Sequence, residues 1–132
     1  MNKMIFILNI WLFTTQIQFS QNNYPKNYFS SPVDIKIAIA GTFGELRKNH
    51  FHSGIDIKTK QKINIPIYAS QAGYISRIKV SPFGFGKTLY INHPNGYTTV
   101  YAHLENFNKE ITEIAHDEHF RLKKNEIDFS LK

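Results

Sequence analysis

The chain has 132 residues and no cysteine, so it is expected to form one domain without disulfide bonds, and any metal must be held by His, Asp or Glu. Its formal net charge of +6 suits an anionic partner such as a cell-wall polymer, although a coding bias toward Lys, Asn and Ile explains the charge equally well. The lysines are scattered and form no cluster with aromatic residues, which argues against nucleic-acid binding.

The first 20 residues predict a secretory signal peptide that is cleaved near Ser20. Lys3 precedes an almost wholly apolar run over residues 4–13, and a more polar stretch follows. A retained anchor is the alternative, but the run is short for a membrane span. We therefore expect an exported protein without a stable span, in which residues 21–33 form a linker and residues 34–132 form the folded domain.

The first half of the domain shows strand patterns separated by a loop. Residues 34–40 (DIKIAIA) alternate apolar and other side chains with period two, which predicts a strand. Residues 41–49 (GTFGELRKN) are expected to form a loop, and residues 52–58 a short strand. Residues 67–80 are rich in β-favouring side chains, and a bend or a hairpin turn is expected at Gly73.

The second half contains the clearest local signals. Residues 88–93 (TLYINH) and 97–104 (YTTVYAHL) are β-prone and flank Pro-Asn-Gly, so they predict a hairpin. Apolar residues recur at helical spacing over residues 109–125, which predicts one amphipathic helix, and residues 127–131 alternate again as a strand. The pattern predicts a mainly β, antiparallel fold, an open barrel or sandwich, with one helix near the C-terminus.

A possible metal site lies in the segment NHFHSGIDI. Positions four apart on a strand face the same side, so His52 and Asp56 point together if this segment is extended. Gly54 between them leaves room for a metal ion and a substrate. Imidazole and carboxylate are suitable zinc ligands. This spacing is common by chance, and taken alone it is weak evidence for a site.

The surrounding motifs resemble a known family. NHFHSGIDIKT, PIYASQAGYISRI and GKTLYINHPNGYTTVYAHL, in that order, resemble the lysostaphin-type zinc endopeptidases of bacterial cell walls (metallopeptidase family 23) over about residues 35–108. The resemblance implies that His52 and Asp56 bind Zn²⁺. It also implies that His103, in the Tyr-x-His-Leu motif, is a catalytic histidine that orients the attacking water or stabilises the oxyanion. A histidine that only packs in a strand is the alternative for His103.

The chain departs from the family at its third zinc ligand. The family has a late His-x-His motif, and no such motif follows His103. The chain is therefore expected to be truncated, whether by biology, by a frameshift or as a gene fragment. His116 and His119 could share a helix face, but a solvated surface is the better interpretation. His93 precedes the hairpin turn and is expected to be a surface or a turn histidine.

The resemblance implies a secreted peptidase that hydrolyses peptide cross-links of peptidoglycan, weakly active or inactive with two zinc ligands. The alternative is a non-catalytic module of the same fold that binds the cell wall or regulates another protein. A biotinyl- or lipoyl-type carrier is disfavoured because the hairpin tip is Pro-Asn-Gly and has no lysine to modify. The oligomeric state stays open.

Overall fold

The computed structural model describes residues 25–131, so the predicted signal peptide lies outside the described residues. The elements follow in the order β1 (Ile39–Gly41), β2 (Asp56–Ile57), β3 (Tyr74–Val80), β4 (Lys87–Asn92), β5 (Thr98–Leu104), α1 (Lys109–Leu122) and β6 (Ile127–Ser130). The fold is mainly β with one helix, and both sheets are antiparallel, as predicted. The described strands do not close into a barrel. Within residues 25–131, no helix is long and apolar enough to cross a membrane.

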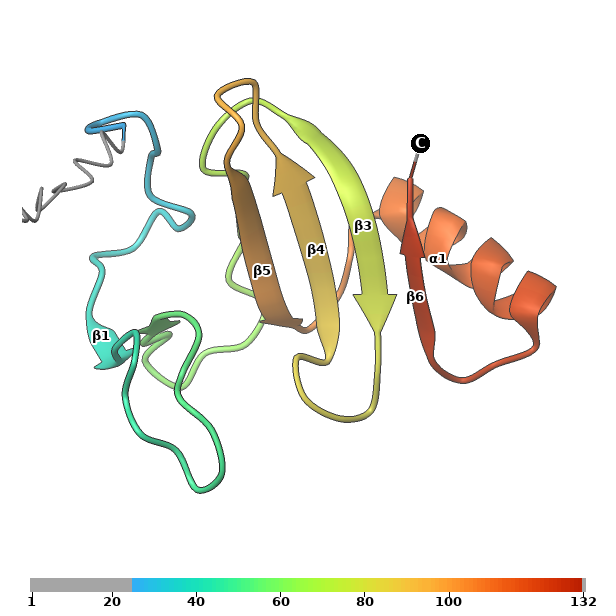
Figure 1. The fold of residues 1–132 in the computed structure, drawn as a ribbon, viewed down its shortest axis with the longest axis horizontal. Helices are drawn as coiled ribbons and strands as arrows, with labels where there is room; N and C mark the ends of the chain where they lie inside the picture. Colours follow the sequence, from blue (N-terminus) through green and yellow to red (C-terminus); the bar gives the residue numbers. More distant parts are fainter. Residues whose placement is uncertain (1–24, 132) are drawn as a thin grey trace, which may run out of the picture.

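The larger sheet has the strand order β5-β4-β3-β6. Strands β4 and β5 form the predicted hairpin, in which the backbone N–H of Gly96 donates to the carbonyl of His93. The strand predicted from residue 127 pairs with β3, with Ile127 opposite Val80. Figure 1 shows α1 beyond the β6 edge of this sheet and the small β1-β2 sheet beyond the β5 edge.

The helix begins and ends where its local sequence supports it. The side chain of Asn108 caps the first turn by accepting a hydrogen bond from the backbone N–H of Ile111 at 2.9 Å. Lys123 ends the helix in the left-handed conformation, slightly earlier than the predicted end at residue 125. Glu110 in the first turn and Arg121 in the last complement the helix dipole.

The hydrophobic core lies between α1 and one face of β3 and β6. Ile78, Ala115 and Ile127 are buried there, and partly buried apolar side chains from both elements surround them. The opposite face of the sheet is polar, with Arg77 bonded to Asp128 across β3 and β6. This alternation is the usual pattern of an antiparallel sheet with one solvated face.

The strands predicted in the first half are shorter in the structure. Only residues 39–41 of the first and residues 56–57 of the second pair with each other, with a register shift between Ile39 and Gly41. The β-rich stretch from residue 67 becomes regular only at Tyr74, just after the predicted bend. Strands β1 and β2 pack on each other and make no comparable contact with the larger sheet, so no neighbouring strand extends them.

Candidate metal site

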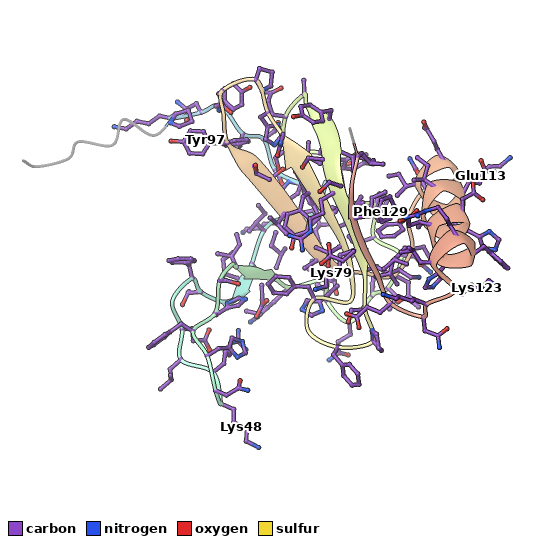
Figure 2. The ribbon with its side chains drawn as sticks, turned by 45° about the vertical axis from the view of Figure 1, so that its right-hand side comes forward. Lys48, Lys79, Tyr97, Glu113, Lys123 and Phe129 are labelled. Atoms are coloured by element: carbon purple, nitrogen blue, oxygen red, sulfur yellow. The ribbon has the colours of Figure 1, made fainter. Side chains whose placement is uncertain are left out.

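The candidate site is built by the loop between β1 and β2, which folds back on itself as a small hairpin. The N–H of Gly44 donates to the carbonyl of His52, and the N–H of His52 donates to the carbonyl of Glu45, both at 2.8 Å. Leu46 then forms a bridge with Phe51. Figure 2 shows Lys48 far from the larger sheet, at the tip of this hairpin.

This hairpin brings His52 to Asp56 by a different route from the predicted one. His52 lies outside β2, so the two residues do not share a strand, and the expectation of a common strand face is wrong. The chain between them bends around Gly54. The Nε2 atom of His52 nonetheless lies 3.2 Å from Oδ1 of Asp56.

The hydrogen bonds of His52 indicate which ring nitrogen carries the proton. Its Nδ1 atom lies 3.0 Å from the carbonyl oxygen of Thr42, which can only accept. Nδ1 therefore donates, and in the neutral ring Nε2 presents its lone pair to Asp56. Nη2 of Arg47 also lies 3.4 Å from Nδ1. When Nδ1 carries the proton, it and Nη2 of Arg47 are both donors, so the contact between them is not a hydrogen bond.

The separation of the two acceptors suits a zinc ion. A ring nitrogen and a carboxylate oxygen at 3.2 Å repel each other unless a proton or a cation lies between them. Two ligand atoms at about 2.0–2.1 Å from a tetrahedral zinc ion are about 3.3 Å apart, close to the observed distance. His52 and Asp56 therefore fit two adjacent positions of a zinc site, and the Asp56 side chain, 42% exposed, leaves access from solvent.

Arg47 binds the other oxygen of the same carboxylate. Its Nη2 atom lies 2.7 Å from Oδ2 of Asp56 and 3.6 Å from Oε2 of Glu45. Gly41 lies against this ion pair, and a Cβ atom there would collide with Arg47 and Asp56. Sequence reasoning missed both residues in this role. Gly41 and Arg47 stood in a stretch predicted as a loop, and no local pattern relates them to Asp56.

His103 sits at an irregularity in β5. Between Lys87 and Leu89 the pairing with β5 shifts register, because Lys87 pairs with Leu104 and Leu89 with Tyr101. His103 is in the extra stretch and has a φ of 56°, a left-handed value that is uncommon for residues other than glycine. Such bulges re-aim a side chain and are frequent beside active sites.

The surroundings of His103 leave its side chain available. Its backbone N–H donates to the carbonyl of Phe85 at 2.9 Å, and its ring faces the Phe85 ring edge-on at 6.5 Å. The residue is exposed. Across residues 25–131, however, no three His, Asp or Glu side chains are grouped to hold one metal ion. The structure thus joins His52 to Asp56 but does not add His103 to that pair.

The histidines of the helix stay apart from the site. The His116 ring packs against the Phe120 ring in a tilted arrangement with centroids 4.4 Å apart, and the neighbouring Glu118 pairs with Arg121. Their helix packs on β6, at the edge of the larger sheet opposite the small sheet (Figure 1). His116 and His119 therefore do not replace a ligand beside His52.

His93 lies beside the hairpin turn, which is one of the two predicted places, but it does not lie at the surface. Its side chain is buried, with the residue 5% exposed. Nδ1 lies 2.9 Å from the carbonyl of Ala72, and Nε2 lies 2.8 Å from the hydroxyl of Thr99. Thr99 is bonded to the hydroxyl of Tyr101, which also accepts the N–H of Ser70. His93 therefore has a structural role, joining the hairpin to the segment before β3.

Comparison with known proteins identifies the family. The family model described as Peptidase family M23 matches residues 50–120, just over half of the chain. This range contains His52, Asp56 and His103. No curated protein and no solved structure matches the chain significantly. The matched range runs from the hairpin that carries His52 through the larger sheet into α1. Because this match covers more than half of the chain, the chain belongs to peptidase family M23.

Proposed function

We propose that this protein is an exported zinc metalloendopeptidase that hydrolyses peptide cross-links of peptidoglycan, and that the 132-residue chain is weakly active or inactive. The observation that carries the proposal is the convergence of His52 Nε2 and Asp56 Oδ1 at 3.2 Å, within the segment matched to a peptidase family that is generally zinc-dependent. The predicted signal peptide and the basic charge support a substrate in the cell wall.

Each residue has a defined part in this reaction. His52 binds the metal through Nε2, because the Thr42 carbonyl holds the proton on Nδ1. Asp56 binds it through Oδ1 and supplies negative charge. A zinc ion bound by these two residues would supply Lewis-acid chemistry, by lowering the pKa of a coordinated water and polarising the scissile carbonyl. His103 orients the attacking water or donates a hydrogen bond to the oxyanion, and its exposed position on β5 leaves it open to substrate.

Weak activity follows from the number of ligands. Catalytic zinc sites usually have three protein ligands and one open position, and the described part of this chain groups two. Metal affinity should therefore be low, and an open site with two ligands orients the metal poorly. A wall-binding module without catalysis is the competing function, and the same two-ligand arrangement is compatible with it.

The test combines zinc binding with the release of fragments from purified peptidoglycan. We expect the purified chain to release fragments slowly and only with zinc, and His52→Ala to abolish both binding and release. His50→Ala is the matched control, because His50 lies in the same hairpin, its side chain is exposed, and that side chain bonds only to Asn49 among the described residues. Wall binding that needs neither zinc nor His52 would favour the non-catalytic module. Rapid hydrolysis that depends on His52 would refute the prediction of weak activity.

A further inference from the structure

The two oxygens of the Asp56 carboxylate have different partners. Oδ1 lies 3.2 Å from Nε2 of His52, whereas Oδ2 accepts a hydrogen bond from Nη2 of Arg47 at 2.7 Å. Hydrogen bonds between charged groups are short and directional. The guanidinium of Arg47 therefore limits rotation of the carboxylate and leaves Oδ1 as the oxygen that faces the metal position.

The backbone of β1 leaves space for this ion pair. Gly41 is paired with Asp56 in the small sheet, and the pairing shifts register between Ile39 and Gly41. A methyl group on Gly41 would overlap both Nη2 of Arg47 and Oδ2 of Asp56. Because the φ of Gly41 is not positive, alanine is compatible with its backbone and would disturb only the ion pair.

Folding stability does not account for this arrangement. The side chains of Arg47 and Asp56 are 36% and 42% exposed, and ion pairs with this exposure contribute little to stability. The alternative is an effect on the metal. Carboxylates bind through one oxygen or through both, and two-oxygen binding suits larger ions with more ligands. An arginine that occupies Oδ2 favours one-oxygen binding.

We propose that Arg47 is a positioning residue that restricts Asp56 to one metal-binding oxygen and so favours Zn²⁺ over larger divalent ions such as Cd²⁺. This inference rests on the proposed function, because it requires that His52 and Asp56 bind a metal. In this proposal Arg47 influences metal selectivity, and the absence of a side chain on Gly41 leaves room for the Arg47–Asp56 ion pair.

The test compares the affinities of the purified, untagged chain for Zn²⁺ and Cd²⁺, each measured by competition with a chelating indicator. Binding that survives in His52→Ala is subtracted. Both ions carry the same charge, so the charge lost in Arg47→Met changes both affinities alike and cancels from their ratio. We expect Arg47→Met to lower the Zn²⁺/Cd²⁺ affinity ratio about tenfold, as for other groups that orient a ligand.

Two further variants make the test specific. Gly41→Ala keeps Arg47 but crowds both Arg47 and Oδ2 of Asp56, so it should break their pairing and lower the ratio in the same direction. Lys48→Met removes one positive charge from the tip of the same hairpin and should leave the ratio within about twofold of the wild type. A ratio unchanged in both Arg47→Met and Gly41→Ala would overturn the assignment while leaving His52-dependent zinc binding, and the proposed function, intact. Absence of any His52-dependent binding in the wild type would overturn both.

Discussion

Replacing Ile127 with alanine should destabilise the larger sheet strongly. Ile127 is 1% exposed and packs with Ile78 and Ala115 between β6 and α1. Truncating a buried isoleucine to alanine typically costs about 2–5 kcal/mol, because apolar contacts are lost and a cavity remains. β6 is a four-residue edge strand that can relax toward the helix, so we expect about 3 kcal/mol.

That loss is large for so small a core. Typical domains unfold with a free energy of about 5–15 kcal/mol, so this variant should lose a substantial part of its stability. The midpoint of thermal unfolding should fall by about 10 °C for a chain of this length. Urea and thermal denaturation followed by circular dichroism measure both quantities. At moderate temperature, a detectable fraction of the Ile127→Ala molecules should be unfolded.

The matched control is Ile63→Ala, which removes the same atoms from a side chain that is 75% exposed. It should change the unfolding free energy by less than about 0.5 kcal/mol. Equal effects of the two substitutions would refute the conclusion that the core lies between α1 and β6. An unfolding transition that is not cooperative in the wild type would also contradict a core that spans both elements.

Three further predictions concern single contacts. Asn108→Ala should cost about 1 kcal/mol of unfolding free energy, measured with urea, because the N–H of Ile111 loses its cap. His93→Leu should cost about 1–3 kcal/mol, because it leaves the Ala72 carbonyl and the Thr99 hydroxyl without their partner; His50→Leu, at an exposed site, should cost far less. The hydrogen bond from Arg77 lowers the pKa of Asp128, so this pair stabilises the fold above the ordinary carboxyl pKa and loses that effect as the pH falls through the lowered value. Asp128→Asn should therefore lower the unfolding free energy at pH 7 by less than about 1 kcal/mol, because the pair is partly exposed, and urea unfolding should show this loss shrinking as the pH falls through the lowered carboxyl pKa; a loss that does not change with pH would contradict this origin.

Local signals in the sequence account for the elements that were predicted well. The β4-β5 hairpin follows from the Asn-Gly turn between two β-prone runs, and α1 follows from its apolar spacing after Asn108. The strands at residues 34–40 and 52–58 were overpredicted. Alternation indicates a strand only where a neighbour covers one face, and here Ile37 and Ile39 are 43% and 41% exposed.

Contacts between distant segments could not be read from local patterns. His93 is buried because residues 28–33 and 67–73 lie against the hairpin, as the edge-on contact of its ring with Phe29 and its bond to the Ala72 carbonyl show. The Arg47–Asp56 pair similarly depends on how the loop after β1 folds back. The motif singled out His52 and Asp56 as candidates, whereas their geometry depends on hydrogen bonds that no spacing rule contains.

The His52–Asp56 pair and the core of the larger sheet depend on different contacts. His52 and Asp56 are held by the Thr42 carbonyl, by Arg47 and by the hairpin around them, all within residues 41–57. The core depends on α1, β3 and β6 at the far edge of the larger sheet (Figure 1). A loop that makes little contact with a stable sheet can open locally without global unfolding. The fraction of chains in which His52 and Asp56 are paired is therefore governed by the short bonds of the loop, and a metal ion that bound only this paired form would stabilise the loop by mass action.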